Sequence, residues 1–272
     1  MKKLASAFFG LIMLFMISSC NILNKYAAYP SPASYHILNV NGETYNDSVQ
    51  NINIDWISGK INIQVSDQYE GVTVFEHCKE QYKDELLCRV LRKNENLNIK
   101  FCASNVSVPN NISKVLEVYI PSNKIISELT INNISSTINI SKIHSQKITI
   151  DNISGSTKIE ECMVNELDYD GVSGSLICLM NQVTTNIEVD QVSGSTLISL
   201  PSSIAGFNID FSTVSGSLNS DFNTRTENDK MIYKDENYLN IQVDSISGSL
   251  SVVRYESTSS PIERESIIPS VE

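Results

Sequence analysis

The chain has 272 residues and a formal net charge of −11. Its Lys and Arg residues form no cluster interleaved with aromatic residues, so the electrostatic footprint of a nucleic-acid-binding protein is missing. An acidic balance of this kind keeps an exported protein soluble and indicates little about its fold.

The first twenty residues have the form of an export signal. Lys2 and Lys3 precede the apolar run LASAFFGLIMLFMISSC, which ends in small residues. Residues 17–20, ISSC, resemble the lipobox of bacterial lipoproteins. We therefore predict that residues 1–19 are a cleaved signal peptide and that Cys20 is lipidated, which anchors the protein to a membrane of the bacterial cell envelope. The run is short for a spanning helix, which needs about 20 apolar residues. An ordinary signal peptide with a chance cysteine and an uncleaved anchor are the alternatives.

The remaining chain is long enough for one large all-β domain. Residues 20–35 are predicted to be a tether and residues 257–272 a polar tail. Residues 36–128 contain irregular strand-like runs, and we expect them to form the N-terminal part and cap of the domain that residues 129–256 complete. A cap is needed because an open end of stacked strands presents unpaired backbone groups.

Five cysteines follow Cys20, namely Cys78, Cys88, Cys102, Cys162 and Cys178. Export permits disulfides, and the odd number leaves at least one free thiol. A bridge between Cys78 and Cys88 across a polar turn is possible, while the spacings match no zinc site. Cys178 occupies an apolar position of the repeat, which favours an inert buried thiol over a redox cysteine.

A repeat with a period of about 20 residues dominates residues 129–256. Its hallmark is Ser-Gly-Ser, as in IDNISGSTKI, with an early relative, IDWISGKINI, and a degenerate copy, INNISSTINI. From Ser135 the key serines recur after 19, 19, 20, 22 and 32 residues. The turn positions are Ser154, Gly155, Ser173, Gly174, Ser193, Gly194, Ser215, Gly216, Ser247 and Gly248. A short fixed period is typical of stacked-repeat proteins.

Apolar columns surround each key serine. They lie six, four and one residue before it and five after it, as in Ile148, Ile150, Ile153 and Ile159. Alternation within each strand predicts β-strands with one buried face. We therefore predict an all-β fold, a single-stranded parallel β-helix (β-solenoid) of about six to eight short coils. Residues 229–243, in the longest interval, are expected to contain a projecting hairpin that leads into the last coil.

The key serines are predicted to be structural. Each glycine is expected to relieve strain at a tight corner, with a positive φ. Repeated serines without a histidine that recurs in the repeat are poor nucleophiles, and GVSGS does not match the nucleophile elbow. No catalytic residue or cofactor is predicted.

A polar column lies three residues before each key serine and includes Asp151, Asp170 and Asp190. We interpret it as a row of corner residues that bond the following backbone. A calcium ladder on these three carboxylates is the alternative.

With these columns aligned, the chain resembles the putative-adhesin domain family of bacterial envelope proteins, a family of unknown function. The resemblance rests on WISGKINI, the entry VYIPS…LTINNIS, the run of Ser-Gly-Ser coils and the tyrosine-containing insertion, over about residues 40–254. It implies a β-solenoid at the cell surface and supplies no catalytic residues.

Three functions remain open. The first is a non-enzymatic, lipid-anchored envelope protein that presents its solenoid surface to a protein or glycan ligand. The second is a polysaccharide-active β-helix enzyme, in which Asp170 and Asp190 would be the first suspects. The third is a scaffold or accessory protein of the envelope stress response.

Overall fold

The structure is a computed structural model that describes residues 26–46, 48–180, 185–234 and 239–255. The predicted signal peptide, the lipidation site Cys20 and the predicted tail at 257–272 lie outside the described residues.

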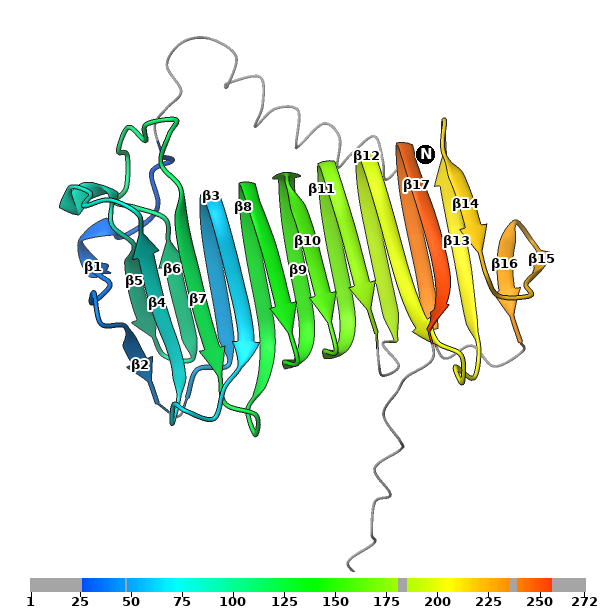
Figure 1. The fold of residues 1–272 in the computed structure, drawn as a ribbon, viewed down its shortest axis with the longest axis horizontal. Helices are drawn as coiled ribbons and strands as arrows, with labels where there is room; N and C mark the ends of the chain where they lie inside the picture. Colours follow the sequence, from blue (N-terminus) through cyan, green and yellow to red (C-terminus); the bar gives the residue numbers. More distant parts are fainter. Residues whose placement is uncertain (1–25, 47, 181–184, 235–238, 256–272) are drawn as a thin grey trace, which may run out of the picture.

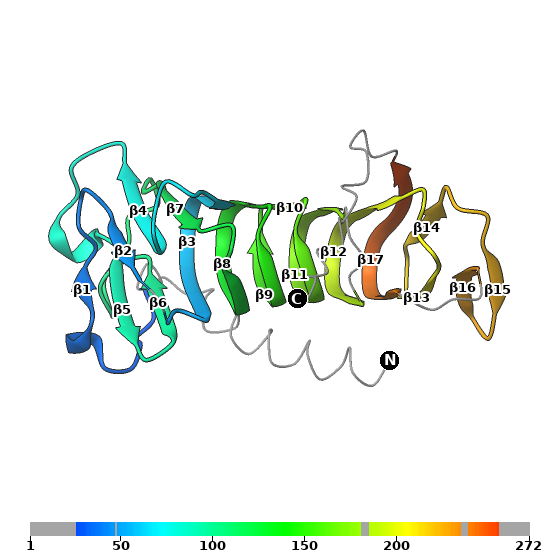
Figure 2. The same ribbon diagram turned by 90° about the horizontal axis from the view of Figure 1, so that it is seen from below.

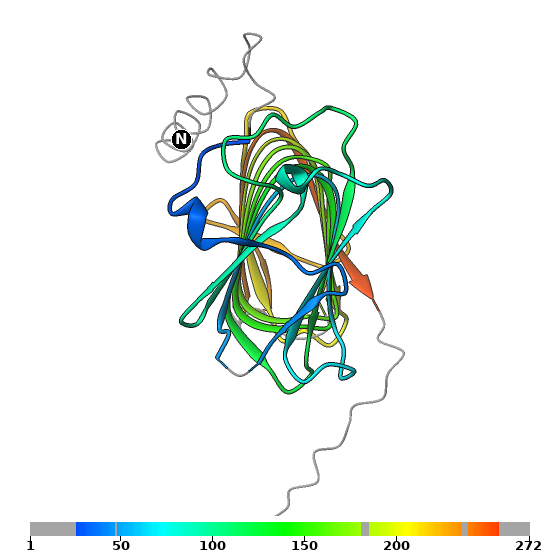
Figure 3. The same cartoon turned by 90° about the vertical axis from the view of Figure 1, so that its left-hand side faces the viewer.

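The fold is a β-solenoid, as the repeat predicts (Figure 1). Viewed along its axis, the solenoid has a flattened cross-section with two broad faces (Figure 3). Long strands bend over a corner, so that one strand contributes to both faces: β3 (Asn51–Val65), β8 (Ile125–Ser141), β11 (Met163–Leu179), β12 (Asn186–Pro201) and β17 (Leu239–Tyr255). In two other layers the corner separates two strands, namely β9 (His144–Ser154) from β10 (Ser156–Glu160), and β13 (Phe207–Thr213) from β14 (Ser217–Ser220).

Neighbouring layers are parallel and keep the repeat in register. Ser135 pairs with Ser58 and with Ser154, and Ser173 pairs with Ser193. The early relative IDWISGKINI is therefore a true layer of the stack. Equivalent residues in successive layers are about 4.8 Å apart, which turns every sequence column into a ladder along the solenoid.

The order of the layers differs from the order of the chain. Strand β17 lies between β12 and β13–β14, so the last strand occupies an interior layer. Strand β3 is likewise enclosed, between β8 and the pair β6 (Asn96–Lys100) and β7 (Lys114–Ile120). The interval before β17 does hold a hairpin, formed by β15 (Arg225–Glu227) and β16 (Lys230–Tyr233). We expected the hairpin further along the chain, within residues 229–243. Instead, β16 pairs with β13, and β17 is a strand of the parallel stack rather than of the hairpin.

Antiparallel strands close the N-terminal end, opposite the β15–β16 hairpin (Figure 2). On one face β5 (Arg89–Lys93) pairs with β6, and β1 (His36–Ile37) pairs with β5. On the other face β4 (Val72–Cys78) pairs with β7, and β2 (Glu43–Tyr45) pairs with β4. Two 3-10 turns, η1 (Pro32–Ser34) and η2 (Asp84–Leu86), complete this cap. The outermost strands are only two and three residues long, which limits pairing with other chains.

The core lies between the two faces and is mainly aliphatic, with buried aromatic side chains such as Trp56 and Tyr169. Ile148 and Ile150 are fully buried, as are their counterparts in the other layers, such as Ile131 and Ile187. The column directly before the key serines was expected in this core, and that expectation is wrong. Ile134 and Val214 are 45% and 79% exposed, and Ile153 is only partly buried.

The physical reason is the parity of the strand. Side chains six, four and two residues before the serine share one face, so the residue one before it points outward. The inward position two before the serine carries small or polar residues instead: Asn133, Asn152, Gly171, Gln191, Thr213 and Ser245. Asn133 Nδ2 donates to Asn152 Oδ1 at 2.7 Å, and Asn152 Nδ2 donates to the Tyr169 hydroxyl at 3.0 Å. Amide side chains thus line the inside of the corner at Asn133, Asn152 and Gln191.

The described part of the predicted tether packs on the domain. The Tyr26 hydroxyl donates to the carbonyl of Asp55 at 3.3 Å, and the Tyr29 hydroxyl donates to the carbonyl of Cys102 at 3.2 Å. The backbone N–H of Tyr29 also donates to Ser104 Oγ at 3.1 Å. Residues 26–29 therefore form part of the surface that surrounds the solenoid corner.

Candidate functional site

The key serines hold neighbouring corners together. Ser154 Oγ donates to the carbonyl of Ile134 at 3.2 Å, and Ser193 Oγ donates to the carbonyl of Val172 at 3.4 Å. Two of the three histidines bond glutamates: His36 contacts Glu43 and His77 contacts Glu117. The hydroxyls of Ser154 and Ser193 therefore bond the backbone of the neighbouring layer.

Three of the repeat glycines have the expected backbone. The φ angles of Gly155, Gly174 and Gly194 are +113°, +147° and +144°. A Cβ on Gly155 would lie 2.2 Å from the carbonyl oxygen of Ser136 in the next layer, so close stacking also requires glycine there. The expectation is wrong for Gly216 and Gly248, which are not among the residues with positive φ.

A groove runs along the outer side of the corner and is the main candidate site. Its volume is about 380 Å³, and it crosses four layers, β3, β8, β9 and β11. One wall is formed by residues 26–29, which include two tyrosines. The other side carries the outward aliphatic column and the polar column, contributed by Ile134, Ile153, Val172, Asp55, Asn132, Asp151 and Asp170.

The polar column forms a ladder in register. Asp170 pairs with Asp151 on one side and with Asp190 on the other. Partial burial, followed by the negative charges of Asp151 and Asp190, raises the pKa of Asp170 to about 6. Burial likewise raises the pKa of Asp151, partly offset by a hydrogen bond from Asp170. Two adjacent carboxylates in this groove thus share an environment that disfavours negative charge.

Other carboxylates on this side have cationic partners. Lys100 Nζ bonds Asp55, and Asn132 Nδ2 donates to Asp55 Oδ1 at 2.7 Å. Lys147 Nζ lies 2.5 Å from Asp168 Oδ2 and 3.9 Å from Glu166 Oε2. The charge of the column is therefore compensated at Asp55, whereas the charges that raise the pKa of Asp170, after burial, are those of Asp151, Asp190, Asp168 and Glu188.

Within the part of the chain that the structure describes, no group of three or more His, Cys, Asp or Glu side chains is arranged to hold a metal ion. The geometry of Asp151, Asp170 and Asp190 accordingly gives the calcium alternative no support.

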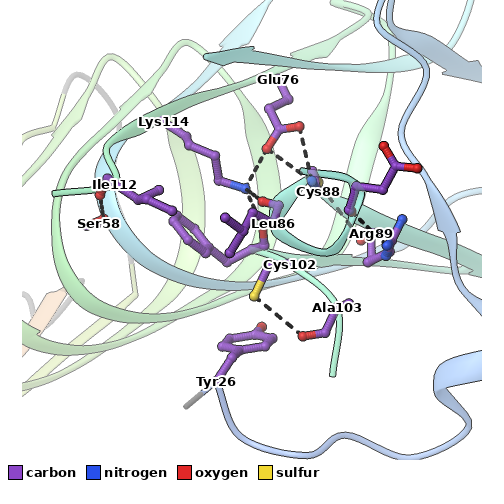
Figure 4. A network of polar contacts seen from close by, with 12 residues as sticks. Tyr26, Ser58, Glu76, Leu86, Cys88, Arg89, Cys102, Ala103, Ile112 and Lys114 are labelled. Carbon is purple, nitrogen blue, oxygen red and sulfur yellow. Dashed lines mark hydrogen bonds and ion pairs between the residues drawn. The ribbon is translucent and has the colours of Figure 1, made fainter. Parts of the chain in front are cut away.

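A second polar cluster lies inside the cap (Figure 4). Lys114 is fully buried, and its Nζ lies 2.5 Å from Glu76 Oε1. The ammonium group also donates to the carbonyls of Leu86 and Phe101, and it lies 3.9 Å from the centroid of the Phe101 ring. Both oxygens of Glu76 accept from the N–H of Cys88. Every polar partner in this cluster is satisfied, so we assign it a structural role. The sequence pattern gave no signal for this pair.

All five cysteines in the described residues are free thiols. The expected hairpin between Cys78 and Cys88 is absent because β4 pairs with β7 rather than with β5. Burial raises the pKa of the Cys78 thiol to about 11 and that of Cys102 to about 12, and it raises the pKa of Cys178 further. Cys178 is completely buried in its apolar column, as expected. Thiols in such settings are poor nucleophiles.

None of the helices in the described ranges has the length and apolar character that a membrane crossing requires.

Comparison with known proteins identifies a family but no curated relative. The family model described as Toastrack DUF4097 matches residues 47–253. No curated protein matches the chain.

Several solved structures are similar at low sequence identity. A "putative cell adhesion protein" from Clostridium sporogenes is 15% identical, covers 81% of this chain and 98% of its own, and has a TM-score of 0.48. A "putative adhesin" from Parabacteroides distasonis is 12% identical, with coverages of 77% and 96% and a TM-score of 0.40. A "putative adhesin" from Bacteroides fragilis is 13% identical, with coverages of 78% and 96% and a TM-score of 0.38.

Proposed function

Starting from the fact that this chain belongs to the Toastrack DUF4097 family, we propose that it is a non-enzymatic envelope protein of adhesin type. In this proposal it is anchored by a lipid on Cys20 and binds macromolecules through the outer side of its solenoid. The observation that carries the proposal is the groove along the corner, where a rigid ladder places aliphatic and polar side chains in parallel columns.

A ladder of this kind suits binding more than chemistry. Each column repeats about every 4.8 Å on backbone that is hydrogen-bonded on both sides, so a ligand meets a surface that is organised before it arrives. Partly exposed aliphatic side chains such as Ile134 and Val172 supply apolar contact, and the adjacent aspartates supply orientation.

The anchor is tested by fractionation. We expect the wild-type protein in the membrane fraction and the Cys20→Ala variant in the soluble exported fraction. Metabolic labelling with a fatty-acid analogue should mark only the wild type. Equal membrane retention of both proteins, without labelling, would show that a lipid on Cys20 is not the anchor.

Binding is tested by presenting the purified protein to an array of extracellular matrix proteins, bacterial envelope components and glycans. An unrelated lipoprotein of similar charge serves as the control. We expect saturable binding to at least one member of the array and none by the control. Saturable binding to none of them contradicts the adhesin-type proposal.

One observation favours an enzyme as a second candidate. Asp170 and Asp190 lie in register on adjacent strands, and the raised pKa of Asp170 is a property of general acids in glycoside hydrolysis. A polysaccharide panel separates the two functions. Release of reducing ends that is lost in Asp170→Asn would replace the binding role with a catalytic one.

A further inference from the structure

The groove has one wall that does not belong to the repeat. Residues 26–29 cross the corner, and the hydroxyls of Tyr26 and Tyr29 are fixed to backbone carbonyls of Asp55 and Cys102. The rings of these two tyrosines pack edge to face, with centroids 5.9 Å apart. The wall is therefore held in place before any ligand binds.

The two ends of the groove differ in how their carboxylates are compensated. At the β3 end, Asp55 is neutralised by Lys100 and accepts a hydrogen bond from Asn132. At the β11 end, the charges acting on Asp170 come from Asp151, Asp190, Asp168 and Glu188. Lys147, which lies on the same strand as Asp151, is already engaged by Asp168. This half of the groove is complementary to a positive charge.

The β3 end also shows which cation fits. The Lys100 side chain reaches Asp55 with its Nζ 5.7 Å from the centroid of the Tyr29 ring. Its stem is covered, since only 12% of the side chain is exposed, while its ammonium group meets the carboxylate. A lysine side chain combines an apolar stem with a compact charge in this way.

The β11 end repeats this chemistry, and the described residues that line the groove include no lysine. Ile153 and Val172 supply the apolar surface, and Asp151 and Asp170 supply two carboxylates about 4.8 Å apart along the ladder. An ammonium group has three N–H donors and can donate to two separate carboxylates at once. The planar guanidinium of arginine instead matches the two oxygens of a single carboxylate.

We propose that the groove binds a lysine side chain of a partner protein, with its stem against Ile153 and Val172 and its ammonium group between Asp151 and Asp170. The proposal rests on the adhesin-type function and names the chemistry of the partner. A protein segment is the expected source because the groove crosses four layers, about 14 Å of ladder, which is longer than one side chain.

The experiment measures binding of a fluorescent hexalysine peptide to the full chain at physiological ionic strength. The matched peptide carries acetyl groups on all six side-chain amines, which removes the charge and keeps the stem. We expect the acetylated peptide to bind at least tenfold more weakly. Free 1,5-diaminopentane should compete poorly, since it lacks a backbone to follow the groove.

The protein variant is Asp151→Asn/Asp170→Asn, and its control is Glu70→Gln/Asp221→Asn, which removes the same charge from exposed positions outside the groove. We expect the groove variant to lose at least tenfold in affinity and the control to stay within twofold of wild type. Thermal melts verify that both variants are folded; a groove variant that fails to fold is replaced by Asp170→Asn alone.

Three results would overturn the inference: equal binding of the acetylated peptide, equal loss in both variants, or competition by 1,5-diaminopentane at the concentration of the peptide. Binding of calcium alone that displaces the peptide would also overturn it and would assign the carboxylates to a metal. If the array experiment finds macromolecular partners whose binding survives lysine acetylation, the adhesin-type function stands and only the lysine inference fails.

Discussion

Ser247 lies in register with Ser193 on the neighbouring parallel strand, although Ser215 comes between them in the sequence. The chain forms β13–β14, continues through the β15–β16 hairpin and then returns to insert β17 against β12. The last described strand thus completes an interior layer, and its pairings join the outermost layer to the rest of the solenoid.

Truncation tests this arrangement. A chain that ends at Lys234 lacks β17, so β12 and β13–β14 each lose a parallel partner and the core is exposed. We expect loss of cooperative unfolding in circular dichroism melts, at least for the C-terminal half. A chain that ends at Glu256 retains β17 and should melt like the wild type. If both truncations melt alike, β17 is not an interior layer.

Two isoleucines on one strand separate the core from the groove. Ile131 is fully buried, whereas Ile134 is 45% exposed on the outer side. Ile131→Asp places a charge in an apolar core and is expected to unfold the protein, because a buried unpaired carboxylate costs several kcal/mol. Ile134→Asp should change the melting temperature by only a few degrees. Similar losses for both would place Ile134 in the core after all.

The corner glycine is tested by Gly155→Ala. At φ +113°, with the Ser136 carbonyl 2.2 Å from the added Cβ, the variant is strained in both backbone and packing. We expect Gly155→Ala to lower the free energy of unfolding by about 1–3 kcal/mol, measured by urea titration. Ser154→Ala removes one hydrogen bond at the same corner and should cost about 1 kcal/mol. A smaller loss for Gly155→Ala than for Ser154→Ala would count against the stacking explanation.

The buried pair Lys114–Glu76 predicts strong coupling. Lys114→Met leaves the Glu76 carboxylate buried without its cation and is expected to cost about 3–5 kcal/mol. Lys114→Met/Glu76→Gln removes both charges and keeps an acceptor for the N–H of Cys88, so it should recover part of that loss. A double-mutant cycle by chemical denaturation measures the coupling, and strict additivity would show that the pair does not interact.

The acidic ladder predicts how stability depends on pH. The pKa of Asp170 is about 6 in the folded protein and 3.8 as an isolated group, so the folded state binds the proton more tightly. Stability from this group is therefore fully present below about pH 4 and is lost as the pH rises to 6. Asp170→Asn should flatten the dependence between pH 4 and 6 and raise the melting temperature at pH 7.

Asp67 provides a control of opposite sign. Hydrogen bonds from Ser122 lower the pKa of this carboxyl, including one from the Ser122 N–H at 2.8 Å. Its contribution is present above the unfolded pKa and is lost as the pH falls through the folded value. Asp67→Asn should therefore lower the melting temperature at pH 7. A rise in both variants would mean that net charge, rather than the ladder, governs the effect.

Much of the architecture could be predicted because the repeat is local. Ile148, Ile150 and Ile187 recur at fixed distances from a corner, and alternation alone assigns them to a buried face. The same logic predicted the carboxylate ladder of Asp151, Asp170 and Asp190, which the register confirms. The outward direction of Ile153 was also implied by strand parity, but its apolar character suggested a core position.

The columns of the repeat thus determine a β-solenoid with aliphatic layers and tight serine–glycine corners, since each layer carries the same local pattern. Only the tertiary structure decided which layers are neighbours. Every coil has nearly the same strand edge, so the repeat pattern does not determine which strands β17 pairs with. The tertiary structure also decided the groove: Tyr26 and Tyr29 lie more than 100 residues before Asp151 in the chain, and long-range hydrogen bonds, rather than any local pattern, fold them across the corner.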